Sequence, residues 1–178
     1  MRYLVAIPVY NEAQYIQRVL PRVQEYARDI LVVDDGSTDA TPELLAEFPD
    51  IRVLRHNENR GYGQSVIDAF DYAILAGYDW IITIDCDEQH DPALLARFIE
   101  RMKADESDVL SGSRYLSEDP NHDAPPADRV RINRTCSDLL AQLVGLQLSD
   151  SFCGFKAHRV SALRRLRLTE AGYAFPLQ

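Results

Sequence analysis

The 178-residue sequence lacks any apolar run near the ~20 residues that a membrane-spanning helix needs. It also lacks a basic N-terminal region followed by the apolar core of a signal peptide. Its three cysteines, Cys86, Cys136 and Cys153, show no C-x-x-C spacing, which argues against a disulfide framework and against a zinc site. We therefore expect a soluble protein of the reducing cytoplasm, or one peripheral to the cytoplasmic face of a membrane.

Basic residues are also scarce. Lys and Arg number 19 against 28 Asp and Glu, giving a net charge of −9 and a pI near 4.9. Such a balance argues against nucleic acid as a general partner, although it allows a local basic site. The sequence has no internal repeat and no low-complexity tract, and 46% of it is hydrophobic. Its length and composition predict a single globular domain over residues 1–178.

Short apolar segments alternate with helix-like segments along the chain. The predicted strands are residues 2–9, 29–34, 51–55, 79–84 and 108–111, and the predicted helices follow Asn11 (with a kink or early end at Pro21) and cover 37–48, 61–76, 91–102 and 130–146. Residues 117–128 are polar and rich in proline, which predicts a mobile loop. Strands that alternate with helices indicate parallel βαβ units, and hence an α/β protein with a doubly wound sheet.

The most informative motif is Asp85-Cys86-Asp87, which directly follows the apolar run 80–84. Two carboxylates separated by one residue offer the oxygen ligands that Mg²⁺ or Mn²⁺ prefers. In an α/β sheet, ligands bind in the crevice outside the carboxyl ends of the strands, which is where this motif is expected. Taken alone, the pattern is also common among ordinary loop acids. Its position at a strand end favours the metal-binding interpretation.

Three further polar segments are expected at the carboxyl ends of strands. They are residues 8–12 (PVYNE), 34–37 (DDGS) and 59–63 (NRGYG). Asn11, Asp34 and Ser37 also suit helix capping, and Gly61 suits a turn. Because all four segments share one edge of the predicted sheet, they place Glu12, Asp35 and Asp85 together. Such an edge suits the base and ribose of a sugar nucleotide, with a cation screening its diphosphate.

These segments, in this order, resemble the nucleotide-binding half of a family 2 glycosyltransferase. The segments GSRY (112–115) and DSFCGFK (150–156) are similar to those of the dolichyl- or polyprenyl-phosphate mannose synthase branch. The resemblance implies a GT-A (Rossmann-like) three-layer sandwich whose mixed central sheet is mostly parallel. It also implies an inverting transfer of a hexose, with mannose favoured and glucose possible, from a GDP- or UDP-sugar to a polyprenyl or dolichyl phosphate at the membrane surface.

The same resemblance assigns roles to individual residues. Pro8, Tyr10, Glu12 and Asp35 would surround the nucleotide base. Asp85 would serve the ribose and the metal, and Asp87 with Gln89 would coordinate the Mg²⁺ or Mn²⁺ that bridges the donor phosphates. Cys86 stands where alanine is commoner, which indicates packing rather than chemistry. The chain stops soon after GYAF (172–175), where relatives continue, so a C-terminal truncation is expected.

Arginine is concentrated in two short runs of this acidic chain. Arg129, Arg131 and Arg134 follow the proline-rich loop, and a second run covers residues 156–167. The planar fork of arginine suits bidentate phosphate contacts. We expect Arg114, Arg129 and Arg131 to meet the donor diphosphate and the acceptor phosphate. For the second run, a solvated face that pairs with acids is preferred over contact with an anionic membrane.

Two side chains are candidates for a general base, His90 and Asp150. A hydroxyl acceptor normally needs a base, whereas a lipid phosphate is already ionised near neutral pH. His90 is expected to orient its loop or cap the next helix rather than take a proton, and the role of Asp150 is left open.

Other classes of protein fit less well. A dehydrogenase needs G-x-G-x-x-G after the first strand, and residues 59–63 follow a later strand without the third glycine. A nucleotidyltransferase would be expected to carry a glycine-rich basic loop after that strand. A glycosyltransferase acting on a hydroxyl acceptor in cell-envelope polysaccharide synthesis and a non-catalytic sugar-nucleotide-binding module stay as alternatives.

Overall fold

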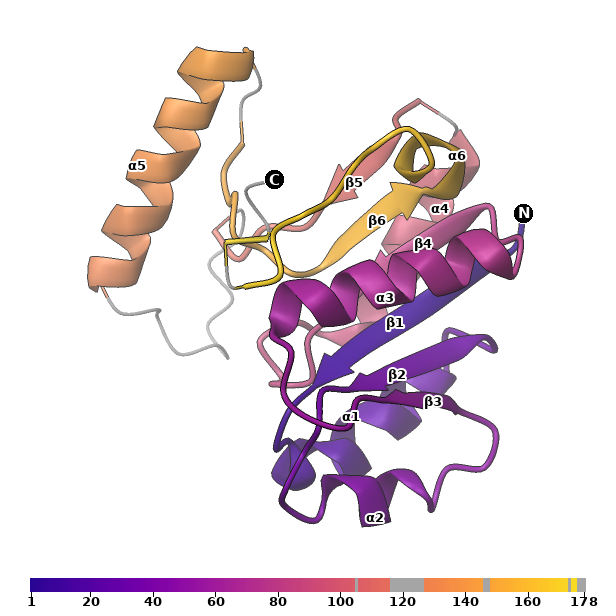
Figure 1. The fold of residues 1–178 in the computed structure, drawn as a ribbon. Coiled ribbons are helices and arrows are strands. Elements are labelled where there is room, and N and C mark those ends of the chain that lie inside the picture. The colour runs from indigo at the N-terminus through magenta and orange to yellow at the C-terminus, as the bar shows by residue number, and fades with distance from the viewer. Residues whose placement is uncertain (105, 116–126, 146–147, 173, 176–178) are drawn as a thin grey trace.

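The computed structural model describes residues 1–104, 106–115, 127–145, 148–172 and 174–175. Its centre is a six-stranded sheet in the order β3-β2-β1-β4-β6-β5 (Figure 1). The strands are β1 (Tyr3–Val9), β2 (Ile30–Asp34), β3 (Arg52–Arg55), β4 (Trp80–Thr83), β5 (Val109–Ser111) and β6 (Lys156–Arg159). Strands β1 to β4 pair in parallel, and β6 runs antiparallel between β4 and β5. The sheet is therefore mixed but mostly parallel, as predicted.

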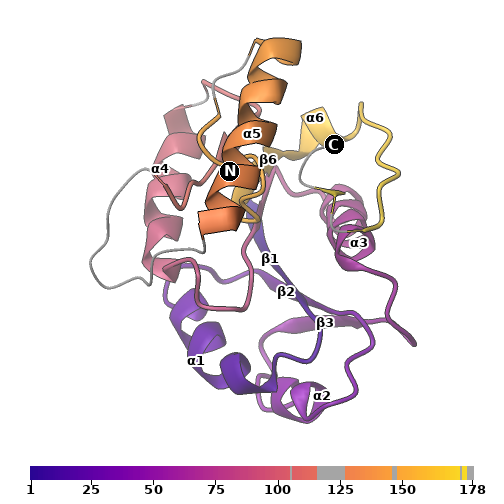
Figure 2. The same ribbon diagram turned by 90° about the vertical axis from the view of Figure 1, so that its left-hand side faces the viewer.

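Helices cover both faces of this sheet (Figure 2). They are α1 (Ala13–Gln24), α2 (Thr41–Leu45), α3 (Tyr62–Leu75), α4 (Leu95–Ala104), α5 (Ala127–Val144) and α6 (Val160–Leu163), with a short 3₁₀ helix, η1 (Pro92–Leu94). Helices α1, α2 and α4 contribute to one apolar core, and α3 and α6 contribute to the other. The predicted three-layer α/β sandwich is confirmed.

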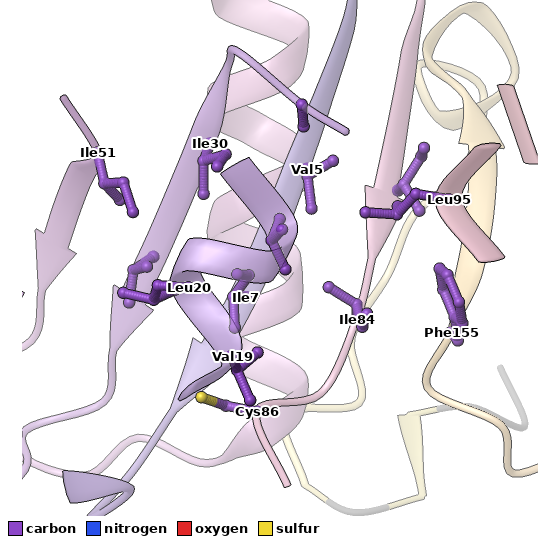
Figure 3. Packing of buried hydrophobic residues seen from close by; sticks show 14 of the residues in the cluster. Val5, Ile7, Val19, Leu20, Ile30, Ile51, Ile84, Cys86, Leu95 and Phe155 are labelled. Atoms are coloured by element: carbon purple, nitrogen blue, oxygen red, sulfur yellow. The ribbon is translucent and has the colours of Figure 1, made fainter. Parts of the chain in front are cut away.

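Alternation along the central strands produces the two cores. In β1, Val5, Ile7 and Val9 face the core that contains α1, whereas Leu4 and Ala6 face the core that contains α3. Successive side chains of a strand point to opposite faces, so a strand buried on both sides reads as a continuous apolar run. Figure 3 shows the first core, in which α1 residues Val19 and Leu20 pack over the sheet.

Several predicted boundaries differ from the structure. Helix α1 continues through Pro21 to Gln24, so the early end is wrong. Helix α2 begins at Thr41 rather than near Ser37, because the side chains of residues 37–39 are engaged in the loop instead. Strand β6 was not predicted. The predicted loop 117–128 lies outside the described residues except for 127 and 128, which begin α5.

Helix α5 stands apart from the sheet and contacts the loop that precedes β6 (Figure 1). Asn133 and Ser137, on its inward face, are buried and bond to Ser149 and Ser151 respectively. Across the described ranges, no helix combines the length and the apolar character needed to cross a bilayer.

Candidate donor-binding site

The four polar segments predicted to meet at one sheet edge do so. The backbone N–H of Asn11, after β1, donates to Ser37 Oγ, after β2, at 3.0 Å. The N–H of Gly61, after β3, donates to Asp35 Oδ2 at 2.8 Å. The hydroxyl of Tyr62 donates to Asp85 Oδ1, after β4, at 3.2 Å. Hydrogen bonds thus join the loops that follow all four parallel strands.

Asn11 anchors the loop after β2 rather than capping α1. Its φ of 57° lies in the left-handed region, which asparagine tolerates better than most residues. In this conformation its Oδ1 accepts from the N–H groups of Thr38 and Asp39, at 2.8 and 3.2 Å. The capping position of α1 is Glu12, without a side-chain cap, so the capping interpretation of Asn11 is wrong.

Asp35 is held by protein groups on both of its oxygens. It is 3% exposed, and its Oδ1 lies 2.6 Å from His56 Nδ1 and accepts from the N–H of Arg60. The other nitrogen of His56 lies 2.8 Å from Asp68 on α3. Asp35 therefore fixes the loop after β3. Its predicted contact with the nucleotide base stays a prediction.

Among the other residues expected around the base, exposure differs. Tyr10 is 43% exposed, and Pro8 and Glu12 are half-buried. Burial, and then the nearby charge of Asp87, raise the pKa of Glu12 to about 7. Glu12 thus shares an electrostatic environment with the acidic pair, although it follows a different strand.

The acidic pair lies at the carboxyl end of β4, as predicted. Burial, and then the charge of Asp87, raise the pKa of Asp85 to about 6. Between them, Cys86 is 2% exposed and points into the first core beside Val19 (Figure 3). Burial raises the pKa of its thiol to about 12, so Cys86 stays protonated and packs as predicted.

The residues at this edge fit a hard divalent cation. Burial and the charge of Asp87 raise the pKa of Asp85 and of Glu12, and a bound cation would offset that cost. The oxygens of Asp85, Asp87 and Gln89 are ligands that Mg²⁺ and Mn²⁺ prefer. Over the described part of the chain, no ready-made group of three or more His, Cys, Asp or Glu is present. Mg²⁺ is commonly bound through one or two carboxylates together with water or substrate phosphates.

Arg114 brings a positive charge to the acidic pair. Its Nη1 donates to Gln89 Oε1 at 3.3 Å, and its charge offsets a small part of the rise in the pKa of Asp85. On its other edge, the guanidinium bonds to Asp150, whose side chain is fully buried. Asp150 also raises the pKa of Arg114 above its ordinary value through these hydrogen bonds.

His90 holds the loop after β4 against the strand β6 region. It is 8% exposed, its Nε2 lies 3.6 Å from Cys153 Sγ, and its ring centroid lies 5.4 Å from that of Phe155. These contacts agree with the predicted orienting role of His90. Helix capping belongs instead to Asp91, whose side chain accepts from the N–H of Ala93 ahead of Pro92.

The two arginine runs differ in their surroundings. Arg129 and Arg131 are exposed on α5, and their predicted phosphate contacts stay predictions. In the second run, Arg159 Nε lies 2.8 Å from Asp108 Oδ1, and Arg165 lies 3.4 Å from Asp108 Oδ2. Pairing with an acid is what the preferred interpretation of that run expected.

Sequence reasoning missed three residues of the site: Tyr62, His56 and Gly154. Tyr62 and Gly154 lie inside segments that were singled out, but their neighbours in space are distant in sequence. A Cβ at Gly154 would collide with the carboxylate of Asp85, which only the antiparallel strand β6 brings alongside β4. His56 carried no pattern of its own that could have found it.

Comparison with known proteins agrees with the family that the sequence resembles. The family model described as glycosyl transferase family 2 matches residues 4–167. An undecaprenyl-phosphate mannosyltransferase of Micrococcus luteus is 32% identical, over 98% of this chain and 74% of the relative. A polyprenol monophosphomannose synthase of Mycolicibacterium smegmatis is 31% identical, over 99% of this chain and 69% of the relative.

Solved structures share the fold at lower identity. Glucosyl-3-phosphoglycerate synthase from Mycobacterium tuberculosis, in complex with Mn²⁺, UDP and phosphoglyceric acid, superposes with a TM-score of 0.76 at 18% identity. The comparison covers 99% of this chain and 61% of the synthase, so this chain spans about three fifths of that structure. The order of the sheet, the four joined loops and the family match lead to one conclusion. The chain belongs to glycosyltransferase family 2.

Proposed function

We propose that this chain is an inverting hexosyltransferase that moves a hexose, with mannose favoured, from a nucleoside-diphosphate sugar to a polyprenyl or dolichyl phosphate. Both relatives described above are named for sugar transfer to a polyprenyl-type lipid phosphate, which supports the acceptor. The donor base is open, because another relative, from Methanococcus voltae, is named for UDP-N-acetylglucosamine. Lipid-phosphate use would place the protein at the cytoplasmic face of a membrane.

The observation that supports a lipid-phosphate acceptor is that both candidate general bases, Asp150 and His90, already contact other protein groups. Asp150 is buried with both oxygens bonded to Arg114, and His90 is packed against Cys153. A hydroxyl acceptor needs a residue to take its proton, whereas a phosphate is largely ionised near neutral pH. The engagement of Asp150 and His90 therefore favours an acceptor that needs no base.

The chain's own residues provide donor binding and charge stabilisation. Asp85, Asp87 and Gln89 would hold Mg²⁺ or Mn²⁺, which when bound supplies positive charge to the departing diphosphate. Arg114 presents a guanidinium beside this group, and Arg129 and Arg131 would meet phosphate from α5. Pro8, Tyr10, Glu12 and Asp35 would line the base and ribose side. The Mn²⁺ and UDP named for the tuberculosis synthase complex support a cation and a nucleoside diphosphate as ligands.

A donor and acceptor panel tests the proposal. GDP-mannose, UDP-glucose and UDP-N-acetylglucosamine would each be incubated with Mg²⁺ or Mn²⁺ and either a short polyprenyl phosphate or the matching polyprenol. Mass spectrometry should detect transfer to the phosphate, and proton NMR should detect an inverted anomeric centre. Asp87→Asn should abolish transfer while the protein keeps its unfolding temperature, whereas Glu88→Gln, in the same loop but paired with Arg18, should remain active.

Other outcomes of this panel would favour another function or change the cation site. Transfer to polyprenol or a sugar hydroxyl would favour the hydroxyl-acceptor alternative. Cation-dependent binding of a nucleotide sugar without transfer to any acceptor would favour a binding module. Full activity of Asp87→Asn would remove Asp87 from the cation site.

A further inference from the structure

Asp150 is the buried carboxylate for which the proposed chemistry has no direct use. Asp150 is 2% exposed, and among the described residues its three hydrogen-bond donors all belong to Arg114. Arg114 Nε donates to Oδ2 at 2.8 Å, Nη2 donates to Oδ1 at 3.0 Å, and the backbone N–H donates to Oδ2 at 3.2 Å. The carboxylate of Asp150 thus accepts hydrogen bonds from both the guanidinium and the backbone N–H of Arg114.

These hydrogen bonds fix the orientation of the Arg114 guanidinium. A bidentate carboxylate contact orients the plane of the arginine fork as well as its position. With Nε and Nη2 occupied, Nη1 faces Gln89 Oε1 at 3.3 Å. The N–H of Gln89 in turn donates to Asp87 Oδ1 at 3.1 Å, so the oriented edge of Arg114 lies on the side of the acidic pair.

The carboxylate is itself held on both flanks. Ser149 Oγ donates to Ser113 Oγ at 2.9 Å, and its carbonyl accepts from Asn133 Nδ2 at 3.2 Å. The N–H of Ser151 donates to Ser137 Oγ at 3.3 Å. Asn133 and Ser137 both lie on α5, so this helix supports the loop that carries Asp150.

We propose that Asp150 is a positioning residue that holds Arg114 with its Nη1 edge toward the diphosphate of the nucleotide donor. Asp150 acts through Arg114 and takes no proton from the acceptor. Helix α5, on which Arg129 and Arg131 also lie, keeps Asp150 in place. The choice of a nucleoside diphosphate as ligand rests on the proposed function, whereas the positioning of Arg114 does not.

Two measurements separate these parts. Nitrogen-15 NMR of arginine Nε–H groups reads the ion pair without any ligand, since Arg114→Lys identifies the resonance by its loss. Asp150→Asn should remove the protection of that resonance from exchange with water. Calorimetry with GDP or UDP and Mn²⁺ then reads donor binding. Asp150→Asn and Arg114→Lys should each weaken it about tenfold or more, which corresponds to ~1.4 kcal/mol.

The double variant decides between positioning and base catalysis. If Asp150 acts through Arg114, then Arg114→Lys with Asp150→Asn should bind nucleotide no more weakly than Arg114→Lys alone. If Asp150 were instead a general base for the acceptor, the Asp150→Asn variant would bind nucleotide as tightly as the unmodified protein. Should that variant fail to fold, Asp150→Glu keeps the charge but moves the fork, and it is expected to shift the Arg114 resonance and weaken nucleotide binding.

Asp108→Asn is the matched control. Asp108 pairs with Arg159 Nε at the same 2.8 Å, at the opposite edge of the sheet. This variant should leave nucleotide affinity unchanged. An unaltered Arg114 resonance in Asp150→Asn would overturn the positioning role, and unaltered affinity would overturn its link to the donor. If the unmodified protein binds neither GDP nor UDP, the proposed function and the donor link fail together, and the NMR result still decides the positioning.

Discussion

At the scale of single residues, the acidic pair depends on a glycine that follows it by nearly 70 positions. Gly154 precedes β6, and a Cβ built there would collide with the carboxylate of Asp85. The carbonyl of Gly154 also accepts from the hydroxyl of Thr83, at the end of β4, at 2.7 Å. The absence of a side chain at Gly154 therefore lets Asp85 lie against the neighbouring strand.

We predict that Gly154→Ala displaces Asp85 and weakens cation-dependent nucleotide binding. Misplaced metal ligands typically cost about 10- to 100-fold in affinity, and overpacking costs about 1–3 kcal/mol of stability. Calorimetry with Mn²⁺ and GDP or UDP measures the affinity, and urea unfolding measures the stability. The control is Gly172→Ala, whose Cβ would meet, among the described residues, the flexible end of Glu170 alone. Equal affinities for both variants would contradict the dependence of Asp85 on Gly154.

Residue patterns in the sequence predicted part of this site. Asp85 and Asp87 could be placed because an apolar strand directly precedes them, and strand ends collect at one edge of a parallel sheet. The partnership of Arg114 with Asp150 could not, because the two residues are separated by 36 positions and joined only by the fold. Asp150 was therefore left open as a base, whereas its geometry is that of a partner for arginine.

At the scale of elements, the N-terminus of α3 is covered by residues 170–171. A Cβ at Gly63 would collide with the backbone carbonyl of Glu170, and the N–H of Gln64 donates to Ala171 O at 3.1 Å. Gly61, with φ of 99°, lies against the same segment. Gly61 and Gly63 therefore allow the backbone at the start of α3 to approach the backbone of residues 170–172 closely. The need for a turn at this point does not by itself explain both glycines.

We predict that Gly63→Ala lowers the free energy of unfolding by about 1–2 kcal/mol, because overpacking outweighs the gain in helix propensity. In an unobstructed helix, the same change normally stabilises by ~1 kcal/mol. Urea unfolding measures the change, and limited proteolysis should cut faster near residues 165–172. Asp71→Ala, at an exposed position of α3, serves as the control and should not destabilise. A more stable Gly63→Ala variant would mean that the segment does not pack on α3.

Strand β6 shows why one element escaped prediction. Its residues, Lys156–Arg159, are mostly polar or charged and too few to show a clear alternation. Antiparallel pairing with both β4 and β5 stabilises the strand, and Ala157 is buried between them. The parallel strands were predictable because burial on both faces requires continuous apolar runs. A short strand whose stability comes from its neighbours has no such signature.

At the scale of the whole molecule, buried titratable groups make stability depend on pH in opposing directions. Desolvation lowers the pKa of His158, on β6, to about 3. Burial and like charges raise the pKa of Glu12 to about 7 and that of Asp85 to about 6. A histidine with a lowered pKa makes the folded protein less stable as pH falls below the pKa of histidine in the unfolded chain, near 6.5. A carboxylate with a raised pKa makes the folded protein less stable as pH rises above the pKa of a carboxylate in the unfolded chain, near 4. The two contributions offset each other in the overall profile.

Replacement of His158 should separate them. His158 packs against Phe70 of α3, with ring centroids 4.9 Å apart, so a charged imidazolium would be poorly solvated there. We predict that the stability difference between the unmodified protein and His158→Gln shrinks by about 1 kcal/mol per pH unit as pH falls from about 6.5 toward 4. Urea unfolding at several pH values, without divalent cations, measures it. Since Glu12 and Asp85 are common to both proteins, their contributions cancel in the difference. A difference that is constant with pH would show that His158 is protonated as readily in the folded protein as in the unfolded chain.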